Sequence, residues 1–142
     1  MQKETIELFH ELKNERRLER FIHDNNQNFM EKPLLEYLAM LLIKYDVKKA
    51  DVIKKAALTP VYGYQIFDGK REPKRDKIIQ LAFGFGLSLE ETQKLLRSAG
   101  YGELYPKVKR DVVFIYAINN KMSIEEVEKI LFKAGEKSIE II

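Results

Sequence analysis

A duplicated segment restricts the possible folds of this chain more than any other feature of its sequence. When the sequence is shifted by 35 residues, residues 74–100 align with residues 109–135, with 11 identities in 27 positions. Each copy contains a capping box, Ser88 to Glu91 and Ser123 to Glu126, in which the serine caps a helix and the glutamate reaches back to it. Each copy therefore predicts a helical hairpin. Because an amphipathic hairpin cannot bury its apolar face alone, we expect the two copies to stack.

Length and composition favour one globular, all-α domain with appendages. The chain has 142 residues, of which 45% are hydrophobic and 33% charged, a balance typical of globular proteins. It has no cysteine, which excludes disulfides and thiolate metal sites and suits a reducing compartment. The charged N-terminus lacks the apolar core of a secretory signal, and the longest apolar runs have seven residues, far fewer than the roughly 20 that span a bilayer. We therefore expect a cytoplasmic protein without membrane contact.

The first part of the chain, residues 1–32, predicts an N-terminal helical extension. Apolar residues recur at spacings of three and four, which indicates one or two amphipathic helices within residues 5–29: Ile6, Leu8, Phe9, Leu12, Leu18, Phe21 and Ile22. Asp24 to Asn28 interrupt this pattern with short polar side chains, which compete for backbone hydrogen bonds and predict a loop.

Clear start and stop signals mark the helices that follow. Pro33 suits the first turn of a helix that continues to about Tyr45, and a second helix is expected over residues 49–57. Thr59 is a good N-cap and Pro60 suits the next position, so a third helix is expected over residues 60–68, ending at Gly69. Further helices are expected over residues 75–85, before Gly86, and from Ser88 onward.

Residues 48–73 resemble the helix-turn-helix of lambda-repressor-like regulators, the xenobiotic-response-element family. In that family a small residue, a hydrophobic residue and a capping Ser or Thr join the two helices, and Gly-Lys-Arg-x-Pro follows the second. Here these places hold Ala57, Leu58, Thr59 and the segment Gly69-Lys70-Arg71-Glu72-Pro73. The resemblance extends from Pro33 to about Leu96. It implies a DNA-binding domain over residues 33–100, with residues 101–142 as the second hairpin and a tail.

One pair of residues departs from the family pattern. The family usually has alanine where this chain has Ile53 and a large aliphatic residue where it has Gly63. The resemblance implies that these two positions face each other across the turn. A volume-conserving exchange is the core change that packing tolerates best, so we interpret the pair as compensation. Glycine nevertheless weakens a helix by roughly 0.5–1 kcal/mol relative to alanine.

The resemblance also assigns residues to DNA contacts and implies a transcriptional regulator, specifically a repressor, with its second motif helix in the major groove. The expected base-reading residues are Thr59, Pro60, Val61, Tyr62 and Gln65. Gln65 could pair with adenine, while Pro60, Val61 and the ring of Tyr62 could contact thymine methyl groups. The expected phosphate-binding residues are Lys48, Lys49, Lys70, Arg71, Lys74 and Arg75. Between residues 44 and 75, nine basic residues face four acidic ones, which supports such contacts.

Two other functions compete with DNA binding. A protein-interaction adaptor would present Val61, Tyr64 and Phe67 to a partner, since aromatic residues with few charges suit a protein interface. An antitoxin would bind both DNA and a toxin, the latter through the repeat. We expect no enzyme activity and no cofactor, because the sequence offers no catalytic constellation. His10 and His23 are the only histidines, and no metal-binding spacing surrounds them.

Double-stranded DNA and a second copy of the chain are the expected partners. A homodimer places two recognition helices one duplex turn apart on a palindromic site. Three surfaces are candidates for the dimer contact: the N-terminal helices, the apolar run 112–118, and Ile139, Ile141 and Ile142 near the C-terminus. For the apolar run, we favour a place in the core.

Overall fold

The computed structural model describes residues 3–29 and 32–139, and every regular element among them is helical. The expectation of an all-α protein is therefore confirmed for these residues. The chain divides into two compact units, residues 1–32 and residues 33–142. The first unit consists of short helices only, whereas the second contains the large core.

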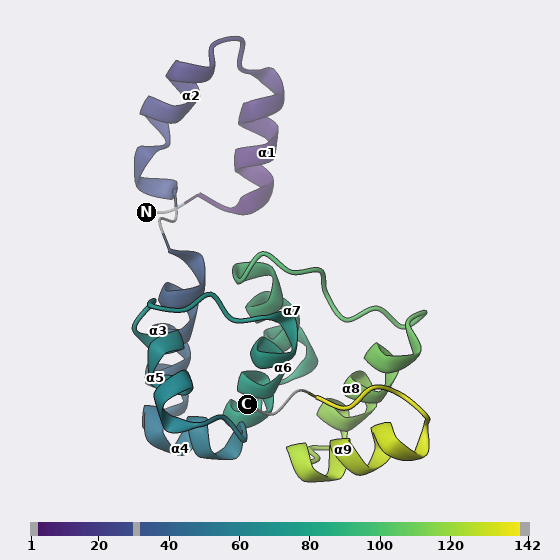
Figure 1. Ribbon diagram of the computed structural model, residues 1–142. Helices are drawn as coiled ribbons and strands as arrows, with labels where there is room; N and C mark the ends of the chain where they lie inside the picture. The colour runs from purple at the N-terminus through teal and green to yellow at the C-terminus, as the bar shows by residue number, and fades with distance from the viewer. Residues whose placement is uncertain (1–2, 30–31, 140–142) are drawn as a thin grey trace. The chain divides into compact units, whose positions relative to one another are not determined.

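The first unit is a pair of short helices. Helix α1 (Thr5–Asn14) and helix α2 (Leu18–Asp24) run antiparallel, and a single 3₁₀ turn, η1 (Asn26–Asn28), follows them (Figure 1). Phe21 and Asn25 are the buried residues of the part of this unit that the structure describes. The Asn25 amide links the two helices, because it donates to Glu11 Oε2 at 3.1 Å and to the Phe21 carbonyl at 3.1 Å. The expected pair of helices is present, and the expected loop contains this 3₁₀ turn.

The second unit begins with five helices around a common core. These are α3 (Pro33–Tyr45), α4 (Lys49–Lys55), α5 (Pro60–Phe67), α6 (Arg75–Phe85) and α7 (Leu89–Ser98). Helix α4 packs against α5 and α6, and α7 packs against α3 and α6 (Figure 1). Their apolar faces supply fully buried side chains, among them Leu38, Leu41, Ile66, Ile78, Ile79, Leu81, Leu95 and Leu96. These positions follow the helical spacing of the sequence.

A carboxylate joins α3 to α7. Glu91 completes the capping box of α7 by accepting from the Ser88 backbone N–H at 3.2 Å. The same side chain accepts hydrogen bonds from the Tyr45 hydroxyl and from Lys44 Nζ, the latter at 2.7 Å. Burial alone would raise its pKa, but the hydrogen bonds from Lys44, Tyr45 and Ser88 lower the pKa of Glu91 to about 2. Glu91 is therefore a charged link between two core helices.

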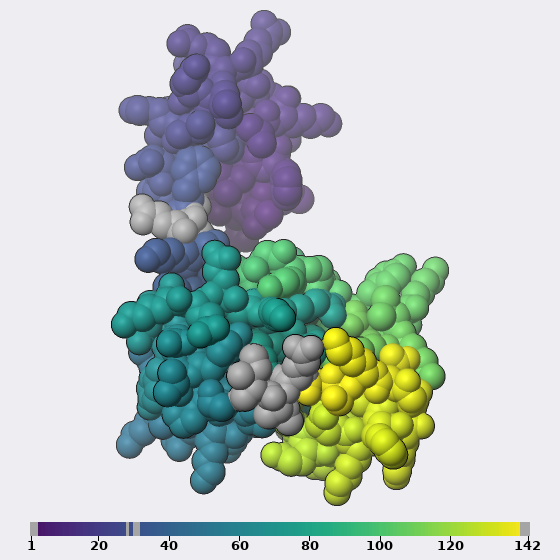
Figure 2. All heavy atoms as spheres, viewed as in Figure 1, coloured from purple at the N-terminus to yellow at the C-terminus, as the bar shows by residue number. Residues whose placement is uncertain are grey.

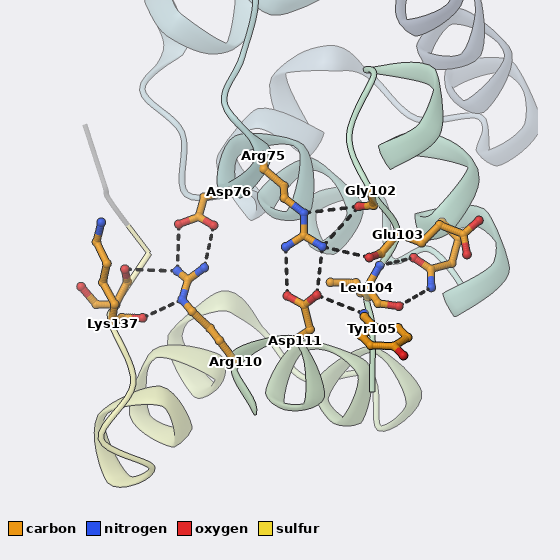
Figure 3. A network of polar contacts seen from close by, with 11 residues as sticks. Arg75, Asp76, Gly102, Glu103, Leu104, Tyr105, Arg110, Asp111 and Lys137 are labelled. Atoms are coloured by element: carbon orange, nitrogen blue, oxygen red, sulfur yellow. Dashed lines mark hydrogen bonds and ion pairs between the residues drawn. The ribbon is translucent and has the colours of Figure 1, made fainter. Parts of the chain in front are cut away.

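The two copies of the sequence repeat pack against each other through the same residues. The second copy forms α8 (Lys109–Asn119) and α9 (Ile124–Lys133), which pack together as a hairpin. Arg75 of α6 forms two parallel bonds with Asp111 of α8, at 2.9 and 3.0 Å. Arg110 of α8 forms the same pair with Asp76 of α6, with both distances 2.8 Å (Figure 3). Since each pair becomes the other on a shift of 35 residues, the contact is isologous, like that of a symmetric dimer.

The equivalence continues into the segment that follows each hairpin. The Nε atoms of Arg75 and Arg110 donate to the carbonyls of Gly102 and Lys137, which are also 35 residues apart (Figure 3). Gln93 and Glu128 occupy equivalent places on α7 and α9, and each accepts a backbone N–H at 2.8 Å, from Leu104 and Ile139 respectively. The structural repeat thus extends beyond the 27 aligned residues to residues 74–104 and 109–139.

The apolar run 112–118 lies partly in the core of the second unit. Four of its residues are buried in the core that α8 shares with the rest of the second unit, as we favoured: Val113, Phe114, Ala117 and Ile118. Val112 and Tyr116 of the same run are exposed, by 43% and 54%. Ile139 was a candidate for the dimer surface, but it is 2% exposed, and that prediction is wrong because the segment after α9 folds back onto Glu128. Ile141 and Ile142 lie outside the described residues.

Candidate nucleic-acid interface

The turn between α4 and α5 contains a residue in the left-handed backbone conformation. Helix α4 ends two residues before the expected position, with Ala56 as its C-cap. Ala57 then adopts a left-handed conformation with φ 59°, and the Leu58 N–H donates to the Ile53 carbonyl at 3.1 Å. This pattern closes the C-terminus of a helix. Leu58 is buried, and Thr59 accepts the Tyr62 N–H at 3.4 Å as the N-cap of α5. The expected caps, Thr59 and Pro60, are confirmed.

Two glycines allow the helices to approach closely around this turn. A β-carbon on Gly63 of α5 would lie 2.6 Å from two side-chain carbons of Ile53 on α4. The expected contact between these two positions is thus present, and Ile53 fills the space that Gly63 leaves. A β-carbon on Gly84 of α6 would lie 2.5 Å from the Val52 carbonyl oxygen. Gly84 therefore lets α6 pack directly on the backbone of α4.

A buried side-chain amide of α6 forms a hydrogen bond with the backbone of this turn. Gln80 of α6 is fully buried, and its Nε2 donates to the Ala56 carbonyl at 3.0 Å. Because Ala56 is the C-cap of α4, this bond satisfies one of the carbonyls that a helix end leaves without a partner. No sequence motif predicts this role. Gln80 occupies an apolar face of a predicted helix, and a polar residue at such a position was the one available signal.

Helix α5 exposes the side on which most of the expected base-reading residues lie. Thr59, Pro60 and Val61 are exposed at its N-terminal end, with Val61 at 70%. One turn later Tyr64 is 41% exposed, and Gln65 is half-buried. The Gln65 Oε1 atom accepts a hydrogen bond from Arg71 Nε at 2.9 Å. Since an amide oxygen has two lone pairs, Gln65 keeps the capacity for one more bond at this atom.

Tyr62 does not belong to this exposed side. We expected its ring to contact thymine methyl groups, but the residue is 8% exposed, so this prediction is wrong. The ring lies beneath two cations, with the Arg71 guanidinium 4.9 Å and Lys77 Nζ 5.8 Å from its centroid. Burial raises the pKa of the Tyr62 hydroxyl. Tyr62 instead supports the loop after α5, because cations stack favourably on aromatic faces.

Five of the expected phosphate-binding residues remain exposed around α5. Lys48 and Lys49 stand at the start of α4, and the other three follow α5 in the chain: Lys70, Arg71 and Lys74. None of the five forms an ion pair with a carboxylate among the residues that the structure describes. Residues of this part of the chain form a broad area of the molecular surface in the view of Figure 2, in blue and teal. We call these five side chains the basic rim.

Arg75 is not part of the basic rim. We expected it to bind phosphate, but its guanidinium is bonded to the Asp111 carboxylate and to the carbonyls of Gly102 and Glu103 (Figure 3). Asp111 itself is 4% exposed. A cation held by a buried carboxylate is costly to remove from its partner, so this prediction is withdrawn. The shared Lys-Arg-Asp of the two repeat copies was a signal for this structural role.

The chain was compared with known families, proteins and structures. Comparisons with protein-family models, curated proteins and solved structures gave no significant match. In the described part of the chain, no group of acidic and histidine side chains is arranged to hold a metal ion. Nor does any helix there have the length and apolar character that crossing a membrane requires.

Proposed function

We propose that residues 33–100 form a lambda-repressor-like helix-turn-helix that binds double-stranded DNA as a transcriptional regulator. In this proposal α5 enters the major groove, and the basic rim contacts phosphates on both sides of it. Thr59, Pro60, Val61 and Gln65 would face the bases. Because Thr59 already caps α5, Gln65 is the principal polar reader, and it would select adenine through its amide.

The concentration of exposed cations on both sides of α5 is the observation that carries the proposal. Exposed lysines such as Lys129 and Lys133 of α9 form no ion pair among the described residues. Other basic residues have carboxylate partners, such as Lys44 with Glu91 and Arg110 with Asp76. The five residues of the basic rim have none among the described residues, although Asp51, Asp68 and Glu72 are close in sequence. Exposed, unpaired cations on both sides of an exposed helix suit an extended polyanion.

A salt titration tests phosphate binding directly. Binding of the full chain to a random duplex should weaken steeply with salt, with a slope of about −0.9 per phosphate contacted. Lys49→Ala should reduce this slope by about 1. Lys129→Ala is the matched control, because Lys129 is an exposed lysine of α9 outside the basic rim, and it should leave the slope unchanged. A flat salt dependence for the unaltered chain would disprove DNA binding.

Selection from a random duplex library tests sequence reading. We expect a selected site with A·T pairs at its centre. Gln65→Ala should lose about 1–3 kcal/mol of binding free energy on that site and little on random duplexes. An equal loss on both would show that Gln65 does not read bases.

A protein-interaction adaptor is the second candidate, and the exposure of Val61 and Tyr64 favours it. Val61 is 70% exposed and Tyr64 is 41% exposed, a combination that also suits a protein interface. An adaptor predicts no salt-dependent duplex binding, whereas an antitoxin binds DNA as well as a toxin and predicts the same salt dependence as a regulator. The salt titration therefore separates the adaptor from the two DNA-binding candidates, and toxin binding through the repeat would separate the antitoxin from the regulator.

A further inference from the structure

The first unit exposes an unusual share of large apolar side chains. Six of its 27 residues in the range 3–29 are large hydrophobic residues with exposed fractions of 45–78%: Ile6, Phe9, Leu12, Leu18, Ile22 and Phe29. Among the 108 residues of the range 32–139, nine large hydrophobic residues are exposed, by 41–86%. Helix α1 has no buried residue, and α2 has only Phe21. The unit thus leaves most of its apolar surface to water.

A unit of this size needs additional stabilisation. Helices of 10 and 7 residues are marginal in water on their own. Folded units below about 40 residues usually depend on disulfides, metals or association. The chain has no cysteine, and the described residues offer no metal site. Association with another surface is the remaining source of stability.

Charge indicates which surface would fit. The open end of the hairpin is acidic, with Glu4, Glu7, Glu11 and Asp24 against Lys3. The end at the turn is basic, with four cations against two carboxylates: Lys13, Arg16, Arg17 and Arg20 against Glu15 and Glu19. A nucleic acid or an anionic membrane would be repelled by the acidic end. A second copy in the opposite orientation would place each acidic end against a basic one.

In the second unit the repeat covers part of its own apolar faces, although Tyr105, Val112 and Tyr116 remain 43–54% exposed. Copies α6–α7 and α8–α9 already form an isologous contact within one chain, closed by two Arg–Asp pairs. Ile139 is buried there as well. The contact that a symmetric dimer would supply between chains is supplied inside this chain.

We infer that two copies of the chain dimerise through their first units, which associate antiparallel as a four-helix bundle. The six exposed apolar side chains form the shared core, and the acidic end of each hairpin lies against the basic end of its partner. This arrangement follows the general packing of helical hairpins into bundles. It does not depend on whether α5 binds DNA.

Sedimentation equilibrium of the full chain tests the apolar contact. The unaltered chain should have twice the mass of 16.7 kDa, and Phe9→Glu should raise the dimer dissociation constant by about 100-fold, since a carboxylate would be buried in the shared core. Phe132→Glu is the matched control. Phe132 is 86% exposed on α9, and its replacement should change the dissociation constant by less than about twofold. A monomer at about 100 µM, or a dimer that Phe9→Glu does not weaken, would overturn the inference.

A charge exchange tests the orientation. Arg16→Glu with Arg17→Glu should weaken the dimer by about 10-fold or more, because both ends of each hairpin become acidic. Adding Glu4→Arg and Glu7→Arg to the same chain should restore it, because the two ends have then exchanged their signs. The antiparallel arrangement is wrong if the two arginine substitutions leave the dimer dissociation constant unchanged. It is also wrong if adding the two glutamate substitutions does not restore the dimer.

DNA binding by α5 and dimerisation through the first unit can be tested independently of each other. Phe9→Glu should keep the salt slope per bound chain, whereas Lys49→Ala should keep the dimer. Loss of the dimer with unchanged DNA affinity per chain contradicts neither proposal. A slope that is flat in a dimeric protein disproves DNA binding alone.

Discussion

Gly63 lies where α5 crosses α4, and the Ile53 side chain occupies the space that a β-carbon would need. The two residues therefore act as one packing unit. Either residue alone would be unremarkable, since glycine destabilises a helix interior and isoleucine is ordinary in a core. Their combination sets how closely the two helices of the candidate motif approach, and hence where the exposed face of α5 lies.

At the residue scale we predict that Gly63→Ala destabilises the protein in spite of the better helix propensity of alanine. The contact at 2.6 Å should cost about 1–3 kcal/mol of unfolding free energy, as overpacking usually does. Ile53→Val should recover part of that loss in the double variant. Urea denaturation of the two single variants and the double variant measures this coupling.

Gly102 provides the control for this prediction. A β-carbon there would meet nothing within 4 Å, and its backbone is not in the left-handed region. Gly102→Ala should therefore change the unfolding free energy by less than about 0.5 kcal/mol. Equal destabilisation by both alanine substitutions would contradict the packing explanation.

At the element scale, the reciprocal ion pairs define how the two hairpins of the repeat meet. Each guanidinium is bidentate, and the carboxylate of Asp111 is 5% exposed. Pairs of this kind are strongly coupled, because the removal of one partner leaves the other charge without compensation.

We predict similar coupling energies for the two pairs. Double-variant cycles on Arg110→Met with Asp76→Asn, and on Arg75→Met with Asp111→Asn, should each give about 1–3 kcal/mol. The exposed pair of Lys94 and Glu90, 3.9 Å apart, should give about 0.3–0.5 kcal/mol in the same measurement. A coupling in only one of the two Arg–Asp pairs would contradict the isologous contact.

The link between α3 and α7 predicts a pH dependence. The pKa of Glu91 is about 2 in the folded protein and near 4.3 in an unfolded chain. A depressed carboxyl pKa stabilises the folded state above pH 4.3, and this contribution decreases as the pH falls toward 2. Glu91→Gln should therefore lower the unfolding free energy at pH 7 by about 2–3 kcal/mol and have a smaller effect at pH 3.

Glu126→Gln is the matched control for the pH experiment. Glu126 forms the same capping box on α9, but no hydrogen bond from another helix to its side chain is present among the described residues. Unfolding curves at several pH values should show a small loss for this variant. If both variants lose equal stability at pH 7, the contacts with Lys44 and Tyr45 contribute little.

At the scale of the whole molecule, the two units differ in how they are stabilised. The large core contains only residues of the second unit, from Leu34 to Ile139. The first unit has one buried apolar residue among those described, Phe21. The second unit should therefore fold without the first.

We predict that residues 33–142, expressed alone, unfold cooperatively. At low protein concentration, where the full chain is monomeric, residues 33–142 and the full chain should have thermal unfolding midpoints that differ by no more than about 3 °C. At high concentration the full chain should gain stability from association and the shorter chain should not. Scanning calorimetry at two concentrations measures both effects. A non-cooperative transition of residues 33–142 would contradict this division of the molecule.

Local signals were sufficient to predict the helices. Caps and helix-ending glycines have their effect within a few residues of the chain, so Thr59, Pro60, Ser88, Ser123 and Gly86 located helix ends that the structure confirms. The sequence alone also determined the duplication, because identity at a fixed spacing needs no coordinates. The fixed spacing did not reveal how the copies meet.

Long-range packing decided the places where prediction failed. Tyr62 and Arg75 belong to residue types that suit DNA, yet the ring is covered by Lys77 and Arg71 and the guanidinium is bound to Asp111, 36 residues away. Charge and hydropathy describe what a side chain could do, whereas burial and a partner depend on which segments meet in space. For this protein the sequence determined its helices and its repeat, and tertiary structure alone decided which cations remain exposed, because burial and ion pairing depend on which segments meet in space.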